Sequence, residues 1–351
     1  MAKHISSKPE PDHRPVSINP RLRQRRRKEH PASYYVQGIR AGDRVILSQA
    51  ITLVESKRPA DQSLARDVVE ACLPYSGKSF RLGLTGVPGV GKSTFIEAFG
   101  LQLIEAGYRP AVLAVDPTSQ LSGGSILGDK TRMAKLSLHP EAFIRPSPAG
   151  KSLGGVAAKT REVMLLCEAA GFDYILIETV GVGQSEVAVH ALTDFFLLLL
   201  LPGGGDELQG MKRGVVEMAD LIAINKADDD RELAARQACS EYQRALHLYP
   251  PKPSGWSAQA VICSAITGKG LSDIREILER FRTQAQESGY LQSHRQEQAV
   301  HWFEDQLQEA LLAHFYEQPD FQARLHTVKE AVRQGQLSPR AGVWQVLSPK
   351  E

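Results

Sequence analysis

The fold is decided by one stretch of the sequence, Gly86-Val87-Pro88-Gly89-Val90-Gly91-Lys92-Ser93, which fits the G-x-x-x-x-G-K-[ST] pattern of a phosphate-binding loop, or P-loop. The short apolar run 81–85 precedes it and is predicted to be a buried strand. The run 94–106 follows it and carries apolar residues at helical spacing. Glycines allow backbone N–H groups to turn toward a phosphate, and the following helix adds the positive end of its dipole. The stretch therefore predicts binding of a nucleoside triphosphate.

Two side chains of this loop are expected to have separate roles. Lys92 should reach the β- and γ-phosphates, and the hydroxyl of Ser93 should ligate Mg²⁺. A glycine-rich turn without a ligand is the alternative, but the strand, the Lys-Ser pair and the helix together argue against it. The nucleotide-binding residues expected here are Gly86, Val87, Pro88, Gly89, Val90, Gly91, Lys92, Ser93 and Thr94.

The composition fits one large core with attached helical segments, since the chain has 351 residues and 42% of them are hydrophobic. The longest apolar run, 195–201, is too short to span a bilayer, and no signal-peptide core is apparent. The four cysteines are widely scattered, which argues against a disulfide framework or a zinc site. We expect a cytoplasmic location, or the mitochondrial matrix in a eukaryote.

Charge is distributed unevenly along the chain. Nine Lys/Arg and three acidic residues give residues 1–30 a charge of +6, and because the whole chain carries +2, the remainder carries about −4. The folded body is therefore not expected to bind nucleic acid. The basic, proline-rich segment 1–36 is predicted to be a disordered arm. Its Arg21–Lys28 cluster leaves open a contact with RNA, an acidic protein or a membrane, a solvated tail, or a transit peptide.

Hydrophobic patterns divide the rest of the chain into three parts. Residues 37–79 are predicted to form a helical hairpin, with Asp43 capping the first helix and Pro59 ending it. Residues 80–288 are predicted to form an α/β P-loop domain with a mainly parallel sheet and helices on both faces. Residues 289–351 are predicted to be helical and to pack onto this domain or form a dimer contact. Strands are expected at 81–85, 111–115, 174–177, 195–201, 221–225 and 260–263, with a long connection over 117–155.

A candidate base-binding loop follows one of these strands. Asn225-Lys226-Ala227-Asp228 fits the N-K-x-D signature of GTPases. The carboxylate of Asp228 can accept hydrogen bonds from N1–H and the exocyclic amino group of guanine, and adenine offers no such pair. Ser264-Ala265 follows a later strand and fits the last base-contacting loop of the same class. We therefore expect GTP and GDP as ligands.

A candidate switch follows another strand. Glu178-Thr179-Val180-Gly181 stands where GTPases carry D-x-x-G. The carboxylate of Glu178 can hold Mg²⁺ through water, and the N–H of Gly181 can sense a γ-phosphate, so residues 181–192 form a candidate switch. Glutamate in place of aspartate departs from the Ras-like pattern. Gln184 also departs from it in position, so water positioning is left unassigned.

Other charged residues lie near the expected site. Asp116 and Asp129 are candidate Mg²⁺ ligands or water holders, although a cap or turn role is the alternative for each. His190 is expected to pack rather than to take part in catalysis. Four cations can steady transition-state charge, although each is individually better explained as a solvated surface charge: Lys130, Arg132, Lys212 and Arg213.

Five stretches together resemble the MeaB/MMAA/ArgK family of P-loop GTPases, from about residue 37 to the end of the chain. The stretches are 86–94, 115–119, 123–133, 178–186 and 225–228. The resemblance implies a G-protein chaperone of an adenosylcobalamin-dependent acyl-CoA mutase of the methylmalonyl-CoA mutase type. It implies gating of cofactor loading and protection of the mutase, with the cobalamin held by the partner.

The resemblance also implies roles for individual residues. Ser93, Asp116, Asp129 and Glu178 would form the Mg²⁺ environment, and Lys92, Glu178 and Asp116 the catalytic set. The loop 203–212 would be a further switch that signals to the mutase. The tail from about residue 290 would be a homodimerisation arm.

Two other functions remain open. The first is a kinase or ATPase linked to lysine/arginine/ornithine transport, against which the N-K-x-D signature argues. The second is a metal-insertion GTPase, which needs clustered Cys and His ligands that the sequence does not show. For a GTPase we expect in-line attack of water on the γ-phosphate, with slow intrinsic turnover that a partner raises.

Overall fold

The computed structural model describes residues 30–115, 133–147, 153–179, 185–203 and 213–347. Within them the chain forms a seven-stranded sheet with the order β3-β2-β4-β1-β5-β6-β7, and every neighbouring pair is parallel. The prediction of a mainly parallel α/β sheet is confirmed. The strands are β1 Phe80–Gly86, β2 Pro110–Val115, β3 Phe143–Ser147, β4 Tyr174–Thr179, β5 Phe195–Leu200, β6 Leu221–Ile224 and β7 Gln259–Ile262.

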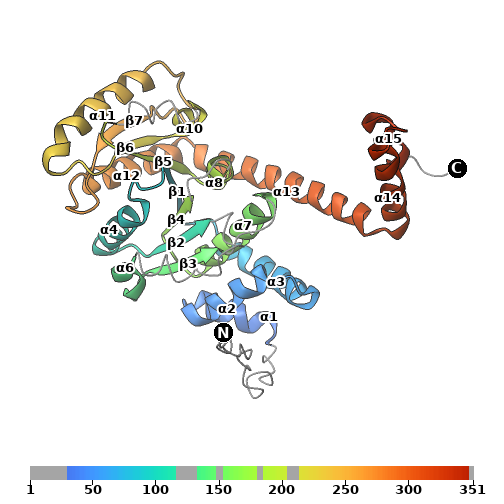
Figure 1. Cartoon of the computed structure of the whole chain (residues 1–351). Coiled ribbons are helices and arrows are strands. Elements are labelled where there is room, and N and C mark those ends of the chain that lie inside the picture. The colour runs from blue at the N-terminus through green and yellow to red at the C-terminus, as the bar shows by residue number, and fades with distance from the viewer. Residues whose placement is uncertain (1–29, 116–132, 148–152, 180–184, 204–212, 348–351) are drawn as a thin grey trace, which may run out of the picture.

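Helices cover both faces of this sheet (Figure 1). Alternate strand residues point to opposite faces, so Leu197 and Leu199 of β5 pack with α4 and α12 while Leu198 and Leu200 pack with α11. Since both faces are covered, the strands are almost continuously apolar. The helices of this unit are α4 Lys92–Glu105, α6 Ala134–Leu138, α7 Leu153–Ala169, α8 Ser185–His190, α10 Arg213–Met218, α11 Glu232–Leu246 and α12 Leu271–Glu287.

Strand β1 lies at the point where the strand order changes direction. β2, β3 and β4 all lie on one side of it, and β5, β6 and β7 lie on the other. In open parallel sheets a crevice for ligands forms at the carboxyl ends of the strands at such a point. The P-loop directly follows β1, so the fold places it in this crevice.

Three helices precede the sheet: α1 Ala32–Arg40, α2 Arg44–Glu55 and α3 Pro59–Cys72. Asp43 caps α2 as predicted, since its Oδ1 accepts from the N–H groups of Val45 (2.8 Å) and Ile46 (3.1 Å). Pro59 begins α3, at the position where a missing N–H costs nothing. Helix α1 was not predicted, and because it starts at Ala32, the boundary drawn at residue 36 falls inside a helix.

Strand β3 and helix α6 lie in the connection 117–155, for which neither element was predicted. β3 runs beside β2, with Ala111 opposite Phe143 and Ala114 opposite Pro146. Proline has no N–H to donate, but β3 is an edge strand and needs to pair on one side only. The strands predicted from the sequence therefore did not include residues 143–147.

The C-terminal helices extend away from the sheet (Figure 1). They are α13 Tyr290–Glu317, α14 Pro319–Arg333 and α15 Pro339–Leu347, and all three lie in the part of the chain predicted to be helical. The first part of α13 packs on the body, and its second part projects from it. At the far end α14 and α15 pack together around Phe321, Val328 and Val346. This tail has its own small core.

Candidate functional site

The backbone of the P-loop requires glycine at two positions for steric reasons. Gly86 ends β1 with φ +155°, and a Cβ there would lie 2.5 Å from the carbonyl oxygen of Leu199. Gly91 has φ +94°, and a Cβ there would lie 3.0 Å from Nδ2 of Asn225. The chain therefore turns from strand to helix within a space that no larger side chain fits. Helix α4 begins directly afterwards at Lys92.

Lys92 lies inside the loop rather than in solvent. Its Nζ donates to the carbonyl oxygens of Gly86 (2.7 Å) and Val87 (3.4 Å). Burial lowers the pKa of Lys92, and the charges of Glu178 and Glu186 partly oppose this effect. Two neutral carbonyls are weaker partners for an ammonium group than phosphate oxygens are, because charge-assisted hydrogen bonds are stronger. The loop thus holds a buried cation that an incoming triphosphate would stabilise.

The base loop is tied directly to the P-loop. Asn225 donates from Nδ2 to the carbonyl oxygen of Val90 (2.8 Å), and its Oδ1 accepts from the N–H of Ala265 (3.1 Å). Lys226 donates from Nζ to the carbonyl oxygen of Gly89 (2.8 Å). One buried amide therefore joins the P-loop, the end of β6 and the loop after β7. The structure brings these predicted nucleotide-binding segments together.

Asp228 lies at the end of this loop with both carboxylate oxygens engaged. Oδ2 accepts from the hydroxyl of Ser264 (2.7 Å), and Oδ1 accepts from Nη2 of Arg231 (2.5 Å). The hydrogen bond from Ser264 lowers the pKa of Asp228, and the nearby Arg231 lowers it further against the opposing effect of burial. An ionised carboxylate is the group that would accept two donors from guanine. The sequence patterns gave no role to Arg231.

The expected magnesium environment is only partly within the described residues. Asp116, Asp129 and Gly181 lie outside them. Glu178 is the next-to-last residue of β4 and lies opposite Leu84 of β1, and its charge acts on Lys92. Ser93 is in the first turn of α4. A hydroxyl and a carboxylate are hard oxygen donors of the kind Mg²⁺ prefers, so the described residues fit this ion.

The segment after α8 is held by α13. Arg295 donates to both carboxylate oxygens of Asp194. Gln298 donates to the carbonyl oxygen of Thr193 (2.9 Å), and Trp302 donates to that of Ala191 (3.3 Å). Side chains from three successive turns of α13 therefore form hydrogen bonds with the connection between α8 and β5. Since α8 belongs to the predicted switch 181–192, these hydrogen bonds join the switch to the C-terminal tail.

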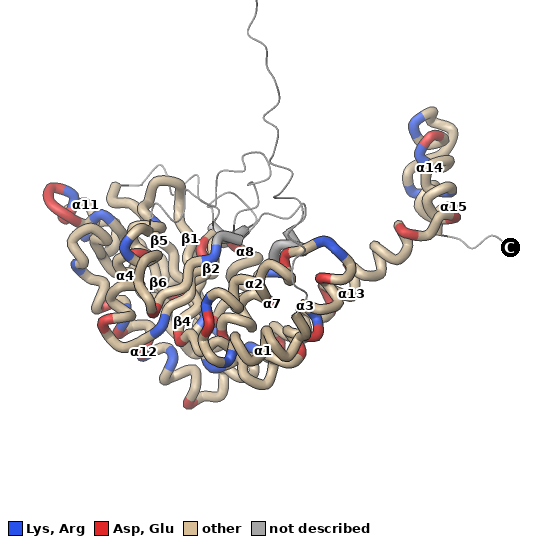
Figure 2. The backbone as a smooth tube through the Cα atoms, turned by 90° about the horizontal axis from the view of Figure 1, so that it is seen from below, with Lys and Arg blue, Asp and Glu red and all other residues tan. Residues whose placement is uncertain are grey.

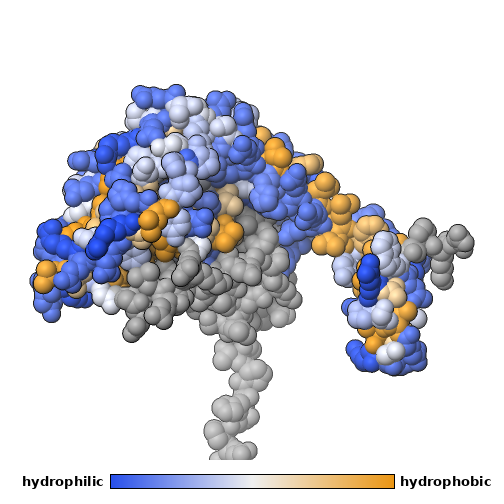
Figure 3. Space-filling view, turned by 90° about the horizontal axis from the view of Figure 1, so that it is seen from above, coloured by the Kyte–Doolittle hydropathy of each residue, from blue (hydrophilic) through white to orange (hydrophobic). Residues whose placement is uncertain are grey.

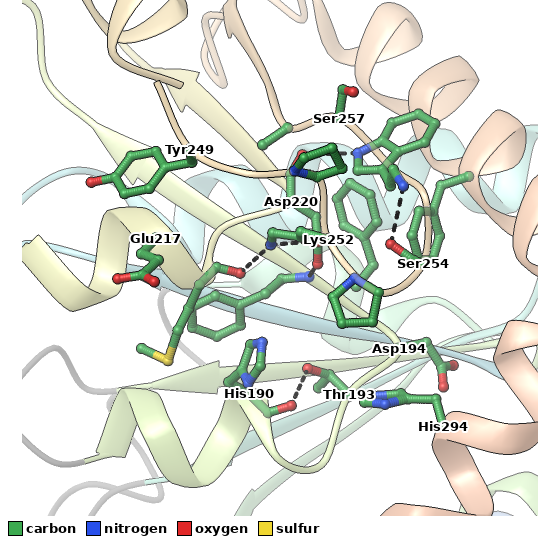
Figure 4. Close-up of a pocket in the computed structure, with 18 of the residues that line it drawn as sticks. His190, Thr193, Asp194, Glu217, Asp220, Tyr249, Lys252, Ser254, Ser257 and His294 are labelled. Carbon is green, nitrogen blue, oxygen red and sulfur yellow. Dashed lines mark hydrogen bonds and ion pairs between the residues drawn. The ribbon is translucent and has the colours of Figure 1, made fainter. Parts of the chain in front are cut away.

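A cavity of about 980 Å³ lies at the other end of the strands from the P-loop. Residues of α8, α10, the loop 246–258 and the start of α13 line it (Figure 4). His190 borders this cavity and packs edge-on against Phe196, and burial lowers its pKa. Lys252 is occupied by Asp220 and by the carbonyl oxygen of Met218, each at 2.7 Å. The cavity is separate from the nucleotide site.

Further features of the described residues bear on other functions. Figure 2 shows Lys/Arg and Asp/Glu positions interspersed along the backbone. Across the described part of the chain, no helix combines the length and apolarity needed to cross a membrane. Within the same part, no group of three or more His, Cys, Asp or Glu side chains is arranged to hold a metal ion.

A parallel sheet with a P-loop at its switch point, tied to an N-K-x-D loop, defines a P-loop GTPase. The chain belongs to the MeaB family: residues 47–320 match the family model described as "Methylmalonyl Co-A mutase-associated GTPase MeaB". This confirms the resemblance found in the sequence.

Relatives support the same assignment. The chain is 47% identical to "GTPase ArgK" of Escherichia coli strain K12, over 89% of this chain and 94% of the relative. It is 46% identical to the mouse "Methylmalonic aciduria type A homolog, mitochondrial", over 86% of this chain and 75% of the relative. A solved structure described as "Crystal structure of LAO/AO transport system kinase" superposes with a TM-score of 0.72 at 40% identity, covering 90% of this chain and 96% of that one.

Proposed function

We propose that this protein is a GTP-binding and GTP-hydrolysing chaperone of an adenosylcobalamin-dependent acyl-CoA mutase of the methylmalonyl-CoA mutase type. It would gate cofactor loading and protect or reactivate the mutase. The observation that carries the GTPase part is the position of Asn225, which joins the P-loop to the base loop. The mutase part is supported by the description of the family, which names a methylmalonyl-CoA mutase-associated GTPase. A cytoplasmic or mitochondrial-matrix location fits this proposal.

In the proposed reaction, water attacks the γ-phosphate in line with the bond to GDP. Lys92 would exchange the carbonyls of Gly86 and Val87 for phosphate oxygens and stabilise the charge that develops there. The P-loop N–H groups would orient the phosphates. Ser93 and Glu178, with Asp116 and Asp129, would hold Mg²⁺, which neutralises phosphate charge when bound. Val182, not glutamine, follows Gly181 in the sequence, which departs from the Ras-like pattern, so intrinsic turnover should be slow.

The route from nucleotide to partner is proposed to pass through α8 and α13. A γ-phosphate that moves residues 181–192 would act on α8, and the connection after α8 is bonded to Arg295, Gln298 and Trp302. The side chain of Asp194 is fully buried and that of Arg295 is 15% exposed, so this pair is shielded from solvent. Networks of hydrogen bonds and ion pairs between packed elements can carry coupling between two sites. We propose 203–212, mostly outside the described residues, as a second contact.

The projecting part of α13 is proposed to form a homodimer. Five exposed apolar residues at helical spacing form the α13 stripe, namely Val300, Phe303, Leu307, Leu311 and Phe315. Figure 3 shows apolar residues gathered along this part of the molecule. An exposed stripe of this length is typical of a helix that packs against a partner.

The dimer proposal predicts the mass of the particle in solution. Sedimentation equilibrium should give twice the 38.5 kDa of one chain. Replacing Phe303 with Asp should give the mass of one chain, because a charge in an apolar interface is costly to bury. A wild-type protein that sediments as a single chain at micromolar concentration would contradict the proposal.

A kinase is the second candidate, favoured by the likeness to the transport system kinase whose structure superposes on this chain. Such an enzyme would transfer the γ-phosphate to a protein or small molecule instead of water. The two functions differ in product: a GTPase releases inorganic phosphate in an amount equal to the GDP formed. The base loop described above favours guanine over adenine and hence the GTPase.

Turnover in the presence of a mutase tests the proposed function. We expect GTP hydrolysis by the full chain to rise by about tenfold or more when a cognate adenosylcobalamin-dependent mutase is added, because a partner that completes a site typically gives large accelerations. Phosphate release with and without the mutase is the measurement, and an unrelated acyl-CoA enzyme is the control. Equal rates in all three would rule out partner stimulation.

A further inference from the structure

The carboxylate of Asp228 is almost fully covered. Its side chain is 6% exposed, and its two oxygens accept hydrogen bonds from Ser264 and Arg231. Guanine would need the same carboxylate for its N1–H and amino group. Because almost none of this carboxylate is exposed, one of its two partners has to move to open it to the base.

The two partners differ in how firmly they are held. Ser264 is fully buried, and its loop is fixed by hydrogen bonds from its N–H to the carbonyl of Lys269 and from the N–H of Gly268 to its carbonyl, both 2.9 Å. Arg231 is the last residue of the one-turn helix η3 Asp229–Arg231, and its side chain is 47% exposed. Long exposed side chains reorient readily. Arg231 is thus the partner that can leave.

We infer that Arg231 is a specificity-determining residue that covers the base site and is exchanged for guanine when nucleotide binds. Its guanidinium would be bonded to Asp228 before nucleotide binds, and N1–H and the amino group of guanine would replace it on binding. This inference rests on the proposed guanine site. A base that lacks this donor pair cannot replace the guanidinium, so the cover adds discrimination to that of Asp228 itself.

The ion pair between Arg231 and Asp228 should lower the apparent affinity for the nucleotide, and this reduction can be measured. Only the fraction of molecules in which Arg231 has moved away can take up the base, so the apparent affinity is reduced by that fraction. Removing the guanidinium should make every molecule competent. A residue that instead oriented Asp228 for the base would have the opposite effect, since its loss would weaken binding. The sign of the change therefore distinguishes the two roles.

The test is Arg231→Ala in the full chain, with a fluorescent GDP analogue as the probe. We expect the association rate constant to rise about threefold to fivefold and the dissociation constant to fall by a similar factor, in the range of a partly exposed ion pair. The difference should shrink at high salt, which weakens the pair in the wild type. Unchanged or weaker binding by the variant would overturn the inference.

Two comparisons make the result specific. The control Arg236→Ala removes the same charge from α11, where Arg236 pairs with Glu232 rather than with Asp228. This variant should leave the association rate constant unchanged. In an Asp228→Asn background, measured with the xanthosine analogue, Arg231→Ala should no longer accelerate association. A wild-type chain that binds no guanine nucleotide would refute the proposed function. A wild-type chain that binds, with no gain in the Arg231 variant, would refute only this inference.

Discussion

Replacing Lys92 with alanine should lower GTP turnover by about 10³-fold or more, which would leave hydrolysis near the detection limit. The ammonium group is the one buried cation that the described residues place inside the P-loop, bonded to Gly86 and Val87. Charge that develops on the γ-phosphate would have no equivalent partner after the substitution. Single-turnover phosphate release under saturating GTP is the measurement, because it separates chemistry from weakened binding.

The matched control for this variant is Lys135→Ala. Lys135 is exposed on α6, so its replacement removes the same charge without touching the P-loop. Turnover by the control should equal that of the wild type, and both variants should keep the wild-type circular dichroism spectrum. Hydrolysis by a folded Lys92 variant at more than about a tenth of the wild-type rate would contradict the role assigned to Lys92.

Replacing Asp228 with asparagine should weaken GTP binding by about 100-fold or more and allow xanthosine triphosphate to bind. The carboxylate would accept two hydrogen bonds from guanine, and hydrogen bonds to an ionised group are about twice as strong as those between neutral groups. The amide presents an N–H₂ donor in place of one acceptor, so it opposes the amino group of guanine and suits the carbonyl of xanthine. Equilibrium titration with both nucleotides measures the change.

The control for the base switch is Asp229→Asn. Asp229 is the next residue, is exposed, and has a φ of +51°, a conformation that asparagine tolerates well. The same chemical change is therefore made at the adjacent, exposed position. Affinity for GTP should be unchanged in this variant. If Asp228→Asn kept the wild-type preference for guanine over xanthine, Asp228 would not be the base-reading residue.

Strands and loops with a strong local sequence pattern could be predicted from the sequence. The strands β1, β2, β4, β5, β6 and β7 are apolar runs bounded by small or polar residues, and the P-loop and N-K-x-D loop have fixed spacing. Their meeting at one edge followed from the geometry of parallel strands. The cap at Asp43 was equally local, since it depends on residues only two and three positions away.

The edge strand β3 could not be predicted from local signals. The segment Phe143–Ser147 contains Arg145 and Pro146, and proline within a short run argues against a strand. Its pairing with β2 depends on a neighbour about thirty residues earlier in the chain, which periodicity does not reveal. Helix α1 was missed for a related reason, because a basic, proline-rich segment comes directly before it in the sequence.

The contacts that join the site to the rest of the molecule were also beyond the sequence. Arg231 lies three residues after Asp228, but an arginine at that spacing is common on exposed turns. The connection after α8 is hydrogen-bonded to side chains about a hundred residues later in the sequence, namely Arg295, Gln298 and Trp302. Only the fold brings such residues together. The roles of Asp116, Asp129 and Gly181 stay predictions, since these residues lie outside the described part of the chain.

The most direct measurement is equilibrium binding of GDP, GTP and ATP to the purified wild-type chain in the presence of Mg²⁺. A base loop tied to the P-loop by Asn225, with an ionised Asp228 at its end, predicts that GDP and GTP bind and that ATP binds at least about 100-fold more weakly. Equal or tighter binding of ATP, or no binding of either guanine nucleotide, would contradict the assignment of this site.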